Sequence, residues 1–199
     1  MKTDIRTLRY GNTYTFLVKG ASDSLLVDTD YAGTMQGFYH ALKAAETRLN
    51  QIRWVMATHY HPDHCGLIGQ LQERGVQLLL IDSQVEAVHA PDYIFAREKR
   101  EYTPVDPASA VILSPNGSRP FLKKLGIEGE IIPTVSHSAD SVSLILDDGN
   151  CFVGDLEPYE YIEAYADNAL LAEDWKQILR RHPKRIHYAH APARAFQTQ

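Results

Sequence analysis

The stretch His59-Tyr60-His61-Pro62-Asp63-His64 places three imidazoles and one carboxylate within six residues. It directly follows the apolar segment 52–57, which reads as a buried strand. In an extended or tightly turned backbone, side chains two positions apart point the same way, so His59 and His61 can reach one metal ion while Asp63 and His64 turn toward a second. Clusters of His and Asp usually mark metals, and a solvated His-rich loop is the weaker interpretation.

The overall composition is that of one ordinary globular domain. The chain has 199 residues, of which 44% are hydrophobic and 23% charged, so it can bury one sizeable core. No repeat, low-complexity tract or linker interrupts it, and we expect a single domain over 1–199. The net charge of -5 argues against a nucleic-acid-coating surface, so the expected partner is a small-molecule substrate.

Cysteine usage and hydropathy bear on the cellular compartment. Cys65 and Cys151 are too few for a disulfide framework and too far apart for a Cys-x-x-Cys motif. The N-terminus is polar and lacks the apolar core of a secretory signal, and no apolar run reaches the ~18 residues of a membrane span. We therefore expect a cytoplasmic protein without a membrane partner.

The first half of the chain alternates between strand and helix patterns. Segments 14–18 and 24–28 are rich in β-branched and aromatic residues and predict a hairpin. An amphipathic helix is expected from about Thr34 to Leu49, because apolar residues recur there at spacings of three and four. After the strand at 52–57, Asp63 stands where it could both bind metal and cap a helix that ends at Gly75. A further strand is expected at 76–81, which gives an α/β order.

The second half repeats this organisation after an irregular segment. Residues 83–126 hold short amphipathic pieces and several prolines, and we expect an inserted cover. Its aromatic residues could line an apolar pocket, cap the sheet or form a homodimer contact, and these alternatives stay open. Strands are expected at 130–132, 142–146, 151–153 and 185–188, with a helix at 169–181. The two halves together predict a four-layer αββα sandwich.

Three further segments carry metal-binding side chains at strand ends. His137 precedes a predicted strand, Asp155 follows one, and His190 follows the last one. Loops at strand ends let a rigid sheet bring distant parts of the chain to one point. His187 competes with His190 as a ligand, but it lies inside the terminal strand, so His190 is favoured.

These motifs resemble those of the metallo-β-lactamase superfamily, and within it the glyoxalase II-like hydrolases and lactonases. The resemblance covers nearly the whole chain, through segments 26–29, 58–66, 136–144, 152–156 and 189–192. It implies that His59, His61 and His137 hold one metal, that Asp63, His64 and His190 hold a second, and that Asp155 bridges both. It also implies that Asp28 supports the site from behind the ligands.

The resemblance and the ligand chemistry together predict a binuclear metal-dependent hydrolase. Imidazoles and carboxylates without thiolates suit Zn²⁺, and also Fe²⁺ or Mn²⁺, so two zinc ions are the first expectation. Two cations would supply a bridging hydroxide near neutral pH that attacks an ester, thioester, lactone or amide. Asp155 would hold both cations, and Asp63 or a metal-bound water would shuttle the proton.

Departures from the sequence patterns of known branches of the superfamily narrow the choice of function. Flavodiiron proteins carry Glu where His61 stands, and glyoxalase II carries a C-terminal glutathione-binding domain, whereas nine residues follow His190 here. Lactonases place a Tyr shortly after the bridging Asp, and Tyr159 is a weak match. An iron-dependent persulfide dioxygenase and a phosphodiesterase acting on nucleotides or RNA remain alternative functions. A complete second ligand set disfavours the first, and the acidic balance disfavours the second.

Overall fold

Two β-sheets form the centre of the protein. The computed structural model describes residues 3–164 and 168–196. The first sheet has the order β1-β2-β3-β4-β5-β6 and the second the order β11-β10-β9-β8-β7. The strands of the first sheet are β1 (Asp4–Arg9), β2 (Tyr14–Lys19), β3 (Ser24–Val27), β4 (Trp54–Met56), β5 (Gln77–Ile81) and β6 (Val111–Leu113). Those of the second are β7 (Gly129–Pro133), β8 (Val142–Leu146), β9 (Asn150–Gly154), β10 (Arg185–Tyr188) and β11 (Arg194–Ala195).

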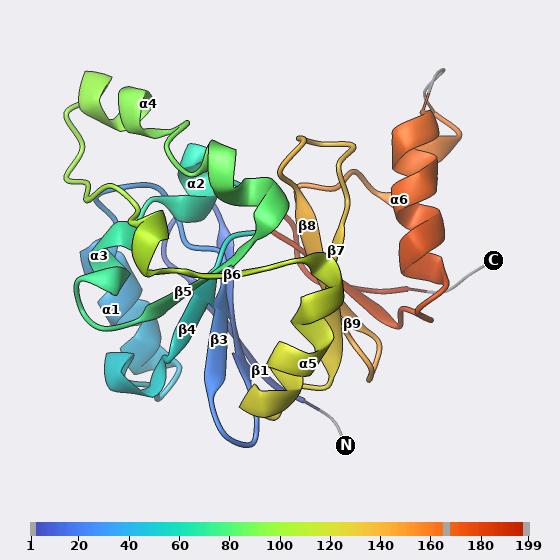
Figure 1. Ribbon diagram of the computed structural model, residues 1–199, viewed down its shortest axis with the longest axis horizontal. Helices are drawn as coiled ribbons and strands as arrows, with labels where there is room; N and C mark the ends of the chain where they lie inside the picture. The colour runs from blue at the N-terminus through green and yellow to red at the C-terminus, as the bar shows by residue number, and fades with distance from the viewer. Residues whose placement is uncertain (1–2, 165–167, 197–199) are drawn as a thin grey trace.

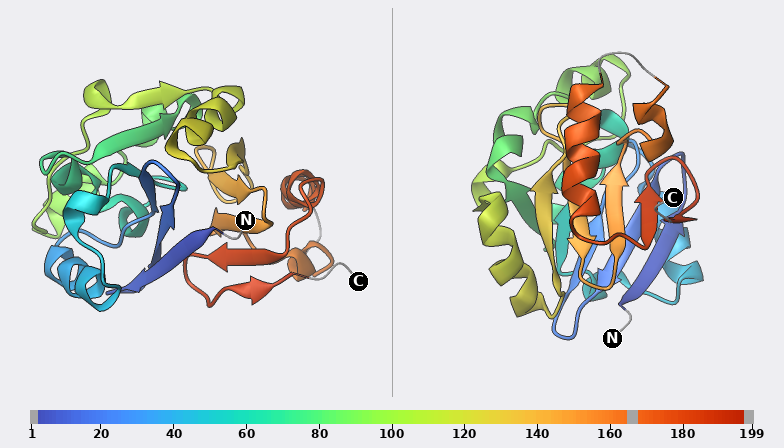
Figure 2. Two further views of the ribbon diagram at one scale, coloured as in Figure 1. Left: turned by 90° about the horizontal axis from the view of Figure 1, so that it is seen from below. Right: turned by 90° about the vertical axis from the view of Figure 1, so that its right-hand side faces the viewer.

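Helices cover the outer faces of both sheets (Figure 1). Figure 2 shows α6 lying across the outer face of the second sheet. The α-helices are α1 (Met35–Ala44), α2 (Pro62–Cys65), α3 (Ile68–Gln72), α4 (Asp92–Arg97), α5 (Pro115–Leu125) and α6 (Ala169–Leu179). Short 3₁₀ helices are η1 (Leu49–Gln51), η2 (Asp82–Ala87), η3 (Pro107–Ser109) and η4 (Tyr159–Ile162).

Three apolar clusters separate the four layers, as the predicted αββα sandwich requires. One joins the first sheet to α1 and α3, one fills the space between the sheets, and one joins the second sheet to α6. β3 shows how the sequence specifies this arrangement, because alternate side chains of a strand point to opposite faces. Leu25 and Val27 enter the cluster between the sheets, whereas Leu26 enters the helix-facing cluster. The four-layer fold is therefore confirmed.

Several predicted elements are present with shorter bounds. The hairpin of β2 and β3 is antiparallel and pairs Phe16 with Val27. The helix predicted from Thr34 to Leu49 ends at Ala44, after which the chain turns into η1. Three strands, β1, β6 and β11, were not predicted. β1 reads as polar because much of it lies on the surface, and β11 has two residues, too few for any periodicity.

The helix expected after the histidine cluster is two short helices, and Asp63 does not cap either. In α2 the N-cap position belongs to His61, no side-chain cap hydrogen bond forms, and Asp63 lies in the first turn. The N-cap position of α3 belongs to Leu67, and no side-chain cap hydrogen bond forms there either. The prediction that Asp63 serves as a helix cap is therefore wrong.

The segment 83–126 combines irregular chain with parts of the central fold. Its first part holds α4 and η3, but β6 pairs in parallel with β5 as the sixth strand of the first sheet. In α5, Leu122 and Leu125 enter the cluster between the sheets. The later part of the expected cover therefore belongs to the sheet and the core. The sequence does not indicate this, because the strand has only three residues and a proline follows it closely. In the described parts of the chain, no helix is both long and apolar enough to cross a membrane.

Candidate metal centre

The seven predicted ligands lie together at one edge of the two sheets. Parallel strands present their carboxyl ends at the same edge, and β9 and β10 are parallel in the second sheet, as are β3, β4 and β5 in the first. The loops that carry the site follow β4, β7, β9 and β10, and α2 begins within the first of them. The side chains that they bring together are His59, His61, Asp63, His64, His137, Asp155 and His190.

A first group consists of three imidazoles and one carboxylate. Each of His59, His61, His137 and Asp155 offers one ligand atom, and these atoms lie within 4.8 Å of one another. Nε2 of His137 is 3.1 Å from Nδ1 of His61. Oδ2 of Asp155 lies 3.7 Å from Nε2 of His137 and 4.0 Å from Nε2 of His59. The four side chains therefore converge on one point.

A second group adjoins the first through the other oxygen of Asp155. Ligand atoms of Asp63, His64 and His190 lie within 4.8 Å of one another, and Nε2 of His190 is 3.2 Å from Oδ2 of Asp63. Oδ1 of Asp155 lies 3.4 Å from Nε2 of His64 and 3.3 Å from Nε2 of His190. One carboxylate thus faces both groups, one oxygen to each.

Oxygen atoms next to Nδ1 orient the two imidazoles of the second group. Nδ1 of His64 is 3.2 Å from Oδ2 of Asp28, and the same carboxylate accepts hydrogen bonds from the backbone amide of Thr58, at 2.6 Å, and from its hydroxyl. Nδ1 of His190 lies 3.3 Å from the carbonyl oxygen of Asn12. With each Nδ1 held by an oxygen, each Nε2 points to the shared centre, as in the oriented histidines of metal sites.

Asp28 holds this position with an uncommon backbone conformation. It directly follows β3 and has a φ of 59°, in the left-handed region where Asp and Asn are enriched among non-glycine residues. Its carboxylate is buried, with 1% of the residue exposed. A buried acidic residue in this conformation costs stability, and its contacts with His64 and Thr58 offset that cost. The observed placement agrees with the supporting role that the resemblance implies.

Three buried polar atoms of the centre have no hydrogen-bond partner in the described structure. They are Nε2 of His59, Nε2 of His64 and Oδ1 of Asp155, although the last two lie within 3.4 Å of each other without hydrogen-bond alignment. A buried polar atom without a partner costs about 1–3 kcal/mol. Cations at the points where these atoms converge would satisfy them, and nitrogen and oxygen donors without thiolate suit Zn²⁺, Fe²⁺ or Mn²⁺. The residues fit a two-metal centre.

The two groups differ in electrostatics in the metal-free protein. Burial and the neighbouring imidazoles lower the pKa of His59 to about 2, and burial also lowers the pKa of His137. Burial acts against a charged His64, but the carboxylates of Asp28 and Asp155 raise its pKa to about 10. The adjacent carboxylates of Asp155 and Asp63 raise the pKa of His190 to about 11. The first group thus presents neutral imidazoles at His59 and His137, and the second presents protonated ones.

The sequence profile of the metallo-beta-lactamase superfamily matches residues 8–195. The chain belongs to the metallo-β-lactamase superfamily. A comparison with curated proteins finds no match. Solved structures share the superfamily fold. TTHA1623 in a di-iron-bound form has a TM-score of 0.71 at 21% identity, over 96% of this chain and 94% of that one.

Two further structures show how widely the superfamily fold is shared. The metallo-beta-lactamase family protein TTHA1429 from Thermus thermophilus has a TM-score of 0.70 at 18% identity, over 97% of this chain and 74% of that one. The metallo-beta-lactamase FIM-1 from Pseudomonas aeruginosa, in its mono-zinc form, has a TM-score of 0.65 at 18% identity, over 98% and 90% of the two chains. At these identities the likeness concerns the fold.

Other residues that the sequence singled out lie outside the two ligand groups of this superfamily member. His187 stacks on Phe152 at a ring distance of 4.5 Å and bonds Asn150 through Nε2. The ring of Tyr159 packs against Trp175. Cys65 is a buried free thiol whose Sγ lies 3.3 Å from the His61 carbonyl oxygen, so it fills space behind the ligand loop. For the seven grouped residues, metal binding stays a prediction.

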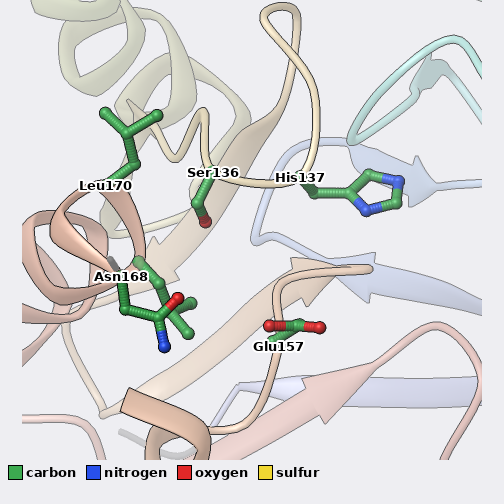
Figure 3. Close-up of a pocket in the computed structure, with 6 residues that line it drawn as sticks. Ser136, His137, Glu157, Asn168 and Leu170 are labelled. Carbon is green, nitrogen blue, oxygen red and sulfur yellow. The ribbon is translucent and has the colours of Figure 1, made fainter. Parts of the chain in front are cut away.

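Two cavities open beside the centre. One, of about 300 Å³, is bounded by Ser136, His137 and Glu157 together with the start of α6 (Figure 3). The other, of about 310 Å³, is bounded by His137, Asp155, His190 and Arg194 among others. No residue of 83–126 lines either cavity. The walls beside the metal centre come from the second half of the chain, rather than from the segment expected as a cover.

Several side chains that hold the ligand loops together were not predicted. The carboxylate of Asp140 accepts hydrogen bonds from the Tyr60 amide, at 2.7 Å, and from the Ser138 hydroxyl, so it ties the loop of His59 and His61 to that of His137. The buried Gln84 donates to backbone carbonyls of both loops. Only Asp140 has a signal in the sequence, since it lies three residues after His137. The role of Gln84 depends on contacts between distant segments.

Proposed function

We propose that this protein is a binuclear metal-dependent hydrolase that cleaves an ester, thioester, lactone or amide. The observation that carries the proposal is the placement of Asp155. Its Oδ2 faces the first ligand group and its Oδ1 faces the second. A carboxylate in this position can hold two cations side by side and balance part of their charge, which is the arrangement that two-metal hydrolysis needs.

The chain's own residues have distinct tasks in this reaction. Divalent cations bound at such donors would lower the pKa of water toward ~7 and polarise a carbonyl oxygen. His59, His61 and His137 would hold one cation, and Asp63, His64 and His190 the other. The hydrogen bond with His190 lowers the pKa of Asp63, so its carboxylate is ionised at neutral pH. Oδ1 of Asp63, which is 3.9 Å from His64, is the atom that we assign to accept and pass on a proton.

The cavities support a small organic substrate. Their volumes of about 300 and 310 Å³ lie at the lower end of the range for small-molecule sites. Both include His137 and Glu157 in their walls, so a substrate bound at the centre would have space beside these two residues. The net charge of -5 also favours a small molecule over a nucleic acid. A glyoxalase II-like or lactonase-like activity fits these dimensions.

The metal and the reaction class are tested by one combined experiment. We expect protein purified without added metal to contain two zinc ions per chain by elemental analysis, and to turn over thioester or lactone substrates in a panel that also includes phosphodiesters. TTHA1623 has been solved with two irons bound, so iron is measured in the same samples. Faster turnover of phosphodiesters than of carbonyl substrates would overturn the proposal. A single iron with oxygen consumption on a persulfide would also overturn it.

A further inference from the structure

The buried face of α6 contains one acidic residue among apolar ones. Leu171, Trp175 and Ile178 pack against the second sheet, and Asp174 shares that face with 3% of its surface exposed. No ion pair of Asp174 with a cationic side chain is found among the described residues. A buried carboxylate without a cation is unfavourable unless hydrogen bonds stabilise it. An apolar residue would suit the packing of this helix better, so Asp174 requires a different explanation.

The carboxylate of Asp174 holds the loop that presents His137. Its Oδ2 accepts a hydrogen bond of 2.8 Å from the backbone amide of Ser136, the residue directly before His137. A charged acceptor makes a stronger and shorter bond to an amide than a neutral one. Figure 3 shows Ser136 and His137 side by side on this loop, opposite the start of α6. The position of the His137 backbone therefore depends on α6.

The next residue of α6 holds the loop that presents Asp155. Nε1 of Trp175 donates a hydrogen bond of 2.8 Å to the carbonyl oxygen of Glu157, two residues after Asp155. The indole is fully buried and stacks on Phe196 at a ring distance of 5.5 Å. A large ring enclosed in this way has one orientation, so its N–H fixes the Glu157 carbonyl.

We propose that α6 sets the geometry of the first ligand group, with Asp174 and Trp175 as adjacent positioning residues for His137 and Asp155. Both residues lie on one rigid helix, so the loops they hold keep a fixed separation, which includes the 3.7 Å between Nε2 of His137 and Oδ2 of Asp155. Ligand constellations tolerate displacements of only about 0.5 Å. The inference rests on the metal binding of the proposed function but not on its substrate.

The test separates metal affinity from fold stability. Asp174→Leu removes the acceptor and fills the apolar face, Asp174→Asn keeps the shape with a neutral acceptor, and Trp175→Phe removes only the N–H donor and part of the ring. Glu173→Gln is the matched control, because Glu173 is the exposed neighbour that pairs with Lys176. Zinc affinity is measured by competition with a chelating dye, cobalt binding by its visible absorption, and thermal unfolding in excess chelator.

Asp174→Leu is expected to weaken zinc binding by about tenfold or more, the lower end of the effect of residues that support ligands. Its unfolding midpoint in chelator should fall by less than about 6 °C, since the loss of one hydrogen bond accounts for no more in a chain of this size. Its cobalt spectrum should also change, because the donors around the first site move. Asp174→Asn and Trp175→Phe should weaken binding less, and Glu173→Gln should leave it unchanged.

Wild-type zinc affinity in both Asp174→Leu and Trp175→Phe would overturn the inference. An equal loss of affinity and of metal-free stability in each variant would also overturn it, because this is the result of a purely structural role. If Asp174→Leu does not fold, Asp174→Asn decides, and wild-type affinity in that variant counts against the inference. A wild-type protein that binds zinc but hydrolyses no carbonyl substrate would refute only the proposed function. A wild type that binds no metal would refute both.

Discussion

The two halves of the candidate metal centre use opposite charge states of histidine. The first group contains three imidazoles and shares one carboxylate, and burial keeps His59 and His137 neutral. The second group adds the carboxylate of Asp63, and acidic neighbours hold protons on His64 and His190. In the metal-free protein, His59 and His137 can bind a cation without losing a proton. His64 and His190 must each lose a proton first. The number of histidines alone therefore does not determine the charge of a metal-binding group.

Removal of the shared carboxylate should have the largest effect, because Asp155 belongs to both halves. We expect Asp155→Ala to abolish turnover, with a loss of about 10³-fold or more typical of an essential electrostatic group. The second metal should also be lost, since Oδ1 of Asp155 faces that group. Kinetics and elemental analysis check both effects, and Asp147→Asn, an exposed carboxylate paired with Arg119, is the control. A variant with wild-type rate and two metals would contradict the shared role.

Single ligand removals should separate the halves. His190→Ala is expected to leave one metal per chain, bound at the first group, because His190 contacts only Asp63 and Asp155 among the carboxylates of the described structure. His137→Ala should loosen the metal of the first group instead. Metal content combined with cobalt absorption distinguishes the two variants, because the spectrum of each site depends on its own donors. Identical metal content and spectra in both variants would show that the halves are not independent.

Asp28→Asn should weaken the second half without removing a ligand. Asn tolerates the same left-handed backbone conformation, so the change is confined to the carboxylate that holds Nδ1 of His64. We expect metal affinity at the second group to fall about 10–100-fold, as for other residues that orient metal-binding histidines. Chelator competition measures this loss, with the exposed Asp106→Asn as the control. Equal weakening of both groups would argue against a specific role for Asp28.

The pH dependence of metal loading should also differ between the two ligand groups. His64 and His190, with pKa values of about 10 and 11 in the metal-free protein, are protonated at neutral pH and must lose protons to bind a cation. Affinity at the second group should therefore rise with pH, by about tenfold per pH unit for each proton displaced. The neutral His59 and His137 of the first group displace none, so affinity there should depend less steeply on pH than affinity at the second group.

Calorimetric titration in two buffers of different ionisation enthalpy counts the released protons. The first equivalent of zinc should release few, and the second should release more. His190→Ala is the control, because it should bind zinc only at the first group, and that single equivalent should release as few protons as the first equivalent of the wild type. Proton release that is the same for both equivalents would mean that the two groups do not differ in charge state.

Local pattern was enough to predict most of the fold. The alternation in β3, the helical spacing in α1 and the hairpin of β2 and β3 depend on neighbours in sequence, and each was predicted with small errors in its bounds. Errors arose where tertiary contacts outweigh local preference. β6 is a strand only because β5 lies beside it. Asp63 does not cap the helix through Leu71, because it lies in a separate short helix, α2, and Leu67 occupies the N-cap position of α3.

The candidate site was predictable to the same extent. The histidine cluster and the residues at strand ends identify the seven grouped side chains, because ligand types and their spacing are local properties of the sequence. The sequence by itself thus determined the fold class, the donor chemistry and the edge of the sheets where the donors meet. The placement of Asp155 between both groups agrees with what the resemblance implied, whereas tertiary structure alone decided that Asp174 and Trp175 hold the ligand loops. These relations join segments far apart in the chain, and only packing brings them within hydrogen-bond distance.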